Sequence, residues 1–152
     1  MMKNKAITAL LLALLMLVSA GCTRNNGDIG DLYGRWKVET LTADGVRLPL
    51  YDGEVEMYAL WFQSELVWIH ELFPHQDYLN HKGMWKREGD KLLLDFSFTG
   101  DYDEQYRPPV ALHFVENGVT PLTVASESSS KMTLWYVGDD GVRYEYFLKK
   151  VY

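Results

Sequence analysis

Apolar and polar residues alternate in short runs along most of the chain that follows residue 32. No run sustains the apolar spacing of three to four residues that marks an amphipathic helix. The runs are rich in Val, Thr, Trp, Tyr and Phe, and turn residues separate them at fairly regular intervals, a pattern typical of an all-β domain. We predict eight strands, over residues 33–42, 54–63, 65–73, 82–87, 91–98, 110–115 with a broken continuation to 125, 131–137 and 142–151.

Successive side chains on a strand point to opposite faces, so each run also predicts which residues face the core. In the run 54–63 this reasoning places Trp61 inward and Phe62 outward. The run 66–73 is apolar on both faces and leaves its orientation open. The inward set that we predict comprises Val55, Met57, Ala59, Trp61, Leu92, Leu94, Phe96, Phe98, Tyr136, Tyr144, Tyr146 and Leu148.

Strands with one apolar and one polar face must bury the apolar face, and closure of their sheet also removes its unpaired edges. The turn sequences between runs, such as Ala43-Asp44-Gly45 and Asp139-Asp140-Gly141, are short enough for hairpins. We therefore predict one all-β domain that forms an up-and-down antiparallel barrel of eight strands. A Greek-key sandwich is the alternative and would need longer crossovers.

Residues 1–21 have the layout of a secretory signal, in which two lysines precede an almost unbroken apolar run over residues 6–18. That run is too short to predict a membrane-spanning helix, although a plain N-terminal anchor is the alternative. Cys22 is the only cysteine and cannot form an internal disulfide. The stretch "LVSAGC" that ends there resembles the lipobox of bacterial lipoproteins, with Ser19 where an apolar residue is usual. The resemblance implies cleavage before Cys22 and its diacylation, and therefore a lipid anchor in a membrane.

Residues 22–31 contain Asn, Gly and Asp and almost no apolar residues, so they predict a flexible tether to a barrel domain over residues 32–152. By the sorting rule known for enteric bacteria, Thr23 in place of aspartate implies the outer membrane. The tether lacks the acidic run that resembles a surface-export signal. We expect the protein to face the periplasm from that membrane.

Its formal net charge of −6 argues against a nucleic-acid partner.

Gly34-Arg35-Trp36 opens the first strand after the tether, and "YEYFLKKVY" ends the last one. These residues resemble the lipocalins and their bacterial lipocalin-like relatives, in which Gly-x-Trp begins the first strand. In that family the tryptophan closes the bottom of the barrel, and a basic residue of the last strand, more usually arginine, packs over its ring. The resemblance implies that Gly34, Trp36 and Lys150 close the barrel here. A second Gly-x-Trp, Gly83-Met84-Trp85, resembles the mid-barrel hairpin of the bacterial proteins.

Three histidines lie in the stretch "HELFPHQDYLNH" beside two carboxylates, and these residue types suit zinc. The first two are one residue too far apart for the His-Glu-x-x-His motif, and Pro74 would break the helix that the motif requires. We therefore predict no metal site at these residues, which are His70, Glu71, His75, Asp77 and His81.

Other catalytic signatures are missing from the sequence. It has no Gly-x-Ser-x-Gly elbow, no phosphate-binding glycine loop and no paired Cys–His arrangement. A solvated acidic loop explains Asp101, Asp103 and Glu104 better than a calcium site does, because the loop lacks the glycine and the ligand spacing. We predict a protein that is not an enzyme and carries no cofactor.

The chain holds five Trp, ten Tyr and six Phe. An eight-stranded barrel is just wide enough either to fill itself with side chains or to hold one small ligand. We expect a small hydrophobic or aromatic ligand inside the barrel. The alternative is a filled barrel that serves as a protein–protein interaction module of the cell envelope, through outward aromatics such as Phe62, Trp135 and Phe147. The predicted ligand-binding residues are Trp61, Phe96, Phe98, Tyr136, Tyr144 and Tyr146.

Overall fold

The computed structural model describes residues 30–51, 53–97 and 106–151. Nine strands form one antiparallel sheet in the order β2-β1-β3-β4-β5-β6-β7-β8-β9. No helix in these ranges is long and apolar enough to cross a membrane. The elements are η1 (Gly30–Leu32), β1 (Gly34–Ala43), β2 (Val46–Arg47), β3 (Met57–Gln63), β4 (Leu66–Leu72), η2 (Pro74–Gln76), β5 (Tyr78–Glu88), β6 (Lys91–Asp95), η4 (Val110–Leu112), β7 (Val119–Glu127), β8 (Lys131–Val137) and β9 (Arg143–Lys150).

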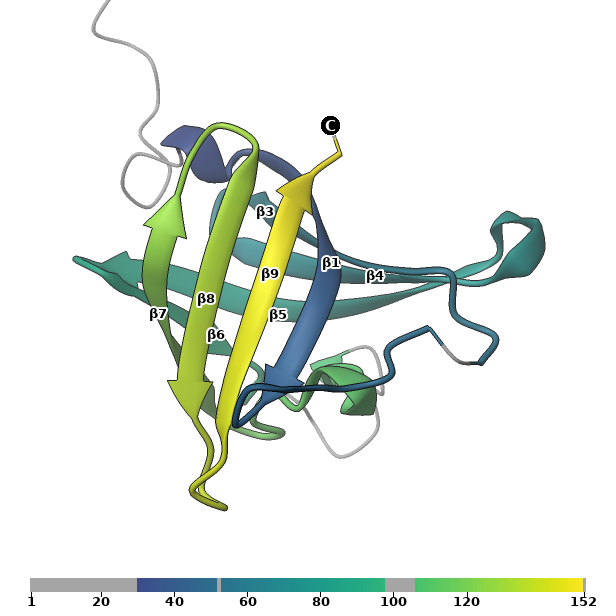
Figure 1. The fold of residues 1–152 in the computed structure, drawn as a ribbon. Helices are drawn as coiled ribbons and strands as arrows, with labels where there is room; N and C mark the ends of the chain where they lie inside the picture. Colours follow the sequence, from purple (N-terminus) through teal and green to yellow (C-terminus); the bar gives the residue numbers. More distant parts are fainter. Residues whose placement is uncertain (1–29, 52, 98–105, 152) are drawn as a thin grey trace, which may run out of the picture.

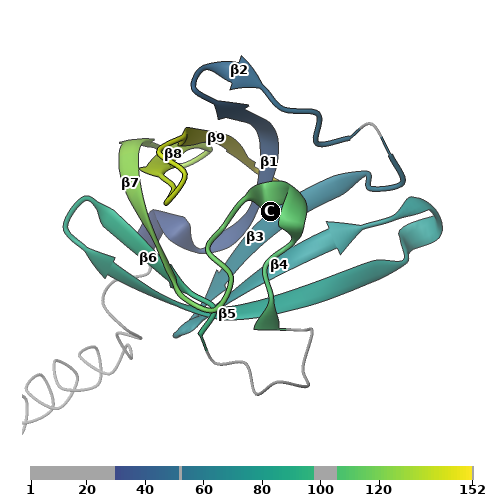
Figure 2. The same cartoon turned by 90° about the horizontal axis from the view of Figure 1, so that it is seen from below.

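The sheet closes on itself because β1 pairs with β9 as well as with β3. The closing pairs run from Trp36↔Lys150 to Ala43↔Tyr144. Since β2 has only two residues and merely extends the edge of β1, the barrel proper consists of eight long strands (Figure 1). Consecutive long strands are neighbours throughout, as the view along the barrel in Figure 2 shows. The predicted up-and-down barrel is confirmed, and the Greek-key alternative is excluded.

Alternation predicted the inward face correctly in β6 and β9, where Leu92, Leu94, Tyr146 and Leu148 are buried. In β3 the prediction was wrong. Tyr58, Leu60 and Phe62 belong to the buried core, and Trp61 lies on the opposite, outer face. The stretch from Met57 to Phe62 is apolar at every position, so its own pattern cannot decide the face. The register does: Leu60 pairs with the buried Trp36, and Trp61 pairs with Arg35.

The sixth predicted strand begins later than expected. Residues 110–112 form the short helix η4, and β7 starts only at Val119. Pro109 precedes the helix, and His113 (φ 54°) and Asn117 (φ 51°) adopt the left-handed backbone conformation, which cannot continue a strand. The apolar residues there pack into the core instead of pairing, because Leu112 and Phe114 are buried. In the view from below, η4 lies across the end of the barrel (Figure 2).

Trp36 lies at the opposite end of the barrel, and its side chain is fully buried. Its indole Nε1 donates a hydrogen bond to the carbonyl oxygen of Leu32 in η1, at 2.9 Å. The ammonium of Lys150 lies 4.8 Å from the centroid of the Trp36 ring. Gly34 has φ 117°, a conformation open mainly to glycine, and lets the chain turn from η1 into β1. The three residues singled out for barrel closure thus lie together at this end.

The second Gly-x-Trp sequence lies in β5 and contributes to the same core. A Cβ atom on Gly83 would lie 2.7 Å from Cε1 of Phe96 and 2.9 Å from the backbone oxygen of Asp95. Glycine is therefore required there for the close approach of β5 and β6. Trp85 is buried and packs edge-on against Phe62, with 5.5 Å between the ring centroids.

We predict that Trp36→Ala destabilises the fold by roughly 3–5 kcal/mol, because it removes a fully buried ring and leaves a void. The control is Trp135→Ala: that ring lies on the outer face of β8, with the guanidinium of Arg143 over it at 4.1 Å, and its loss should cost far less. Chemical denaturation of both variants measures the difference. Equal losses, or a larger loss for Trp135→Ala, would contradict the assignment of Trp36 as the barrel plug.

Candidate functional site

The barrel interior contains an aromatic stack. The ring centroids of Tyr146 and Phe114 are 5.0 Å apart, those of Tyr136 and Tyr144 are 5.7 Å apart, and Phe96 stacks on Phe114 at 6.2 Å. Phe96, Tyr136, Tyr144 and Tyr146, which the sequence predicted as ligand-binding residues, therefore contact one another and Phe114. Phe98 lies outside the described residues.

The loop that carries η4 is hydrogen-bonded into this stack. The Tyr146 hydroxyl donates to the carbonyl oxygen of Leu112 at 2.7 Å, and the Tyr136 hydroxyl donates to the carbonyl oxygen of His113. Burial raises the pKa of Tyr136 to about 12 and raises that of Tyr146 well above its ordinary value. Both hydroxyls therefore keep their protons and act as donors. Leu112 and Phe114 of this loop are themselves buried in the core.

We predict that Tyr146→Phe loosens η4, because it leaves the buried carbonyl of Leu112 without its donor, a loss of about 1–3 kcal/mol. Tyr33→Phe is the control, since Tyr33 is 65% exposed. Hydrogen exchange should become faster at the His113 amide, which donates to Val110 within η4. Unchanged exchange and unchanged stability in Tyr146→Phe would show that this hydrogen bond does not hold the loop.

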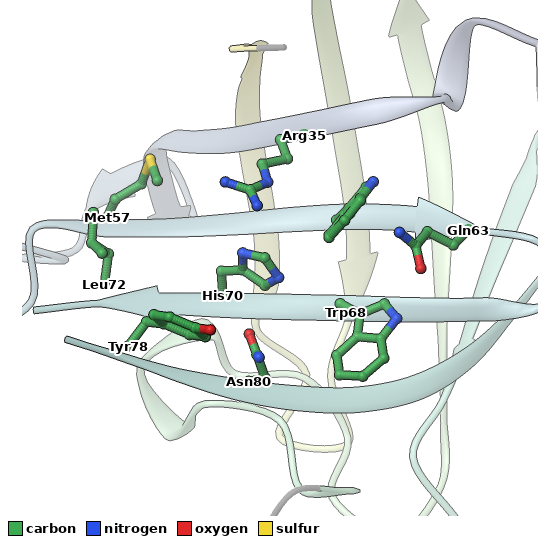
Figure 3. A pocket seen from close by; sticks show the side chains of 9 residues that line it. Arg35, Met57, Gln63, Trp68, His70, Leu72, Tyr78 and Asn80 are labelled. Carbon is green, nitrogen blue, oxygen red and sulfur yellow. The ribbon is translucent and has the colours of Figure 1, made fainter. Parts of the chain in front are cut away.

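A pocket of about 380 Å³ opens on the outside of the barrel, over strands β1, β3, β4 and β5 (Figure 3). We call it the outer-face pocket. On the outer face of β3, Ala59 lies between Met57 and Trp61 and pairs with His70 of β4. The side chains that line the pocket are Arg35, Met57, Trp61, Gln63, Trp68, His70, Leu72, Tyr78 and Asn80.

The aromatic rings of the outer-face pocket are ordered by contacts with each other and with Arg35. The imidazole of His70 meets the Trp61 ring edge-on at 5.5 Å between centroids and stacks on Tyr78 at 6.1 Å. The guanidinium carbon of Arg35 lies 5.0 Å from the centroid of Trp61. Burial lowers the pKa of His70 below its ordinary value, and the positive charge of Arg35 lowers it further. The imidazole is therefore neutral near pH 7.

Two residues of the lining each have a buried polar atom with no hydrogen-bond partner among the described residues: the indole Nε1 of Trp68 and the amide Oδ1 of Asn80. One is a donor and the other an acceptor. Both atoms have almost no accessible surface, so they do not face the open space of the pocket.

The histidines of the sequence do not come together. His70 lies in the outer-face pocket, His75 lies in η2 with φ 67°, and His81 lies on the inner face of β5. The Nε2 atom of His81 lies 2.9 Å from Oε2 of Glu71, and its Nδ1 lies 2.7 Å from the carbonyl oxygen of Arg107. Within the described ranges no group of three His, Cys, Asp or Glu side chains could hold a metal ion. Cys22, Asp101, Asp103 and Glu104 lie outside those ranges.

Of the predicted ligand-binding residues only Trp61 lines the outer-face pocket, and sequence reasoning assigned it, like Met57, to the inner face. The signal that it missed is the run 66–73, whose orientation it left open. Because Val67 and Ile69 face the core, Trp68 and His70 of the same strand face outward. Two aromatic rings on the outer face of an internal strand were the available sign of an external site.

Comparison with known proteins supports the fold. No protein-family model matches the sequence, and no curated protein matches it either. A lipocalin-like protein from Bacteroides uniformis has a similar structure, with a TM-score of 0.58 and 18% identity over 80% of this chain and 99% of that one. An uncharacterized protein from Bacteroides eggerthii is also similar, with a TM-score of 0.55 and 15% identity over 78% of this chain and 98% of that one. At these identities the likeness shows a lipocalin-like fold.

Proposed function

We propose that this protein binds a small planar apolar or aromatic molecule in the outer-face pocket. The single observation that carries this proposal is a pocket of about 380 Å³ on the outer face, whose walls include the aromatic rings of Trp61, Trp68 and Tyr78. Small-molecule sites typically combine apolar walls with a few polar groups that orient the ligand. Lipocalin-like proteins are generally binding proteins without catalytic activity, and the fold is compatible with this role.

Binding can be measured with the neutral fluorescent dye N-phenylnaphthylamine. We predict that Trp61→Ala weakens its affinity by roughly five- to tenfold, because the variant loses an aromatic wall of the pocket. Trp135→Ala is the matched control, since Trp135 also lies on the outer face under an arginine but on β8, away from the pocket. Fluorescence titration gives both dissociation constants.

If the wild type and Trp61→Ala bind the dye with equal affinity and Tyr146→Phe binds it more weakly, the binding site lies in the barrel interior. Absence of dye binding, together with a stoichiometric protein cross-linked to the wild-type chain in its native envelope, would favour the interaction module. The tip of the β4–β5 hairpin is the surface that supports this second candidate, because Tyr78 is 60% exposed and Leu79 is 55% exposed. Of the outward aromatics that suggested it, Phe147 is exposed, but Phe62 is buried.

We also propose that the mature protein is a lipoprotein attached through Cys22 to the outer membrane and facing the periplasm. The sequence "LVSAGC" and the apolar run before it support this assignment. Two acyl chains on one cysteine are sufficient for stable anchoring, whereas the acidic balance of the chain gives no electrostatic attraction to anionic lipid.

We predict that Cys22→Ser moves the protein from the membrane fraction to the soluble fraction and abolishes its labelling with radioactive palmitate. The hydroxyl of serine is not a substrate for the thioether-forming step of lipoprotein maturation. Immunoblots of fractionated cells provide the measurement, and Thr23→Ser provides a neighbouring control that should stay with the membrane. Retention of Cys22→Ser in the membrane fraction would mean that another feature anchors the chain.

A further inference from the structure

We propose that the outer-face pocket selects planar ligands that carry an oxyanion, such as a carboxylate or a sulfonate, and that Arg35 binds that group. This inference rests on the proposed function and adds the charge class of the ligand to it.

The charges around the pocket support an anionic ligand. Arg35 is the only lining residue with a permanent charge, and no Asp or Glu lines the pocket. Two further cations flank it on the outer face: Lys37 of β1 pairs with Ala59 of β3, and Lys82 of β5 pairs with Trp68 of β4. The lining of the pocket thus carries a positive charge, although the formal net charge of the chain is −6. Local fields of this kind attract oppositely charged ligands.

Arg35 is oriented but not neutralised. Its guanidinium carbon lies 5.0 Å from the centroid of the Trp61 ring, so the ring limits the directions in which the side chain can point. Within residues 30–51, 53–97 and 106–151, the ion pairs are His81–Glu71, Lys86–Glu88 and Arg87–Glu127, and none of them involves Arg35. A guanidinium held in this way presents a planar set of N–H donors that can bind a carboxylate or a sulfonate with two parallel hydrogen bonds.

The remaining polar groups of the pocket complement such a ligand. Because His70 is neutral near pH 7, Arg35 alone supplies the charge within the lining. The amide side chains of Gln63 and Asn80 also line the pocket, and each carries donor and acceptor groups. Figure 3 shows Trp68 and Asn80 on neighbouring strands, with Arg35 across the pocket from Asn80. A ring that carries an oxyanion at one edge and an N–H or O–H donor at another would satisfy these groups.

The test compares two dyes that share one ring system and differ in charge: neutral N-phenylnaphthylamine and its sulfonated analogue, anilinonaphthalene sulfonate. The readout is the ratio of their dissociation constants for the full chain. We expect the wild type to bind the sulfonated dye more tightly, and Arg35→Gln to reduce this preference by on the order of tenfold. The matched control is Arg143→Gln, which removes an arginine from the outer-face Trp135 and should leave the ratio unchanged. Salt should weaken binding of the sulfonated dye more than binding of the neutral one.

The outcomes separate this inference from the proposed function. If the neutral dye binds and depends on Trp61 but the sulfonated dye binds no more tightly, the pocket is a binding site and the charge selection is wrong. If Arg35→Gln weakens the binding of both dyes equally, Arg35 only supports the Trp61 ring, and the inference is again overturned. A preference for the sulfonated dye that Arg35→Gln leaves intact would place the anion at another cation, such as Lys82. Binding of neither dye would contradict the proposed function itself.

Discussion

The antiparallel pairing of β1 with β9 is the interaction on which the rest of the structure depends. It converts a sheet with two open edges into a closed wall, and it fixes which face of every strand is inside. The same pairing places Lys150 beside Trp36, so the residues that plug one end of the barrel are brought together by the register that closes it. Without this pairing, Trp36 would be an exposed ring at the start of an edge strand.

Closure also determines where a ligand can bind. Inside the barrel, the large rings of Tyr136, Tyr144 and Tyr146 stack with one another and with Phe114 from the β6–β7 loop. On the outside, side chains of four strands line a pocket of about 380 Å³, with Met57 and Trp61 contributed by β3. The fold is lipocalin-like, while the pocket that we propose lies on the wall of the barrel and not within it.

The sequence was sufficient to predict the barrel, because alternation and turn residues are local signals. In runs such as Lys91–Asp95 and Arg143–Lys150, only one of the two sets of alternate residues is clearly apolar, and the inward face was predicted correctly. Around Trp61 the residues on both faces of the strand are apolar. Which face is buried depends on the register with Arg35, a residue more than twenty positions away. The apolar residues Leu112 and Phe114 resemble a strand locally, but they fill the barrel end instead. The outer-face pocket could not be predicted, because four strands contribute to it and no local motif connects them.

The pairing of the first long strand with the last one gives this domain a further property. The amide of Val151 donates to the carbonyl oxygen of Arg35 at 2.9 Å, so the backbone leaves the last strand beside the point where it enters the first. In the topology of the barrel, the junction between these ends is equivalent to one of the hairpin turns. The strand pairing therefore does not require that β1 come first in the chain. A short peptide that joined the ends, with a new break in the exposed Asp139–Gly141 turn, would preserve every strand pair. The same geometry makes this end a place where segments can be attached without crossing the rest of the fold.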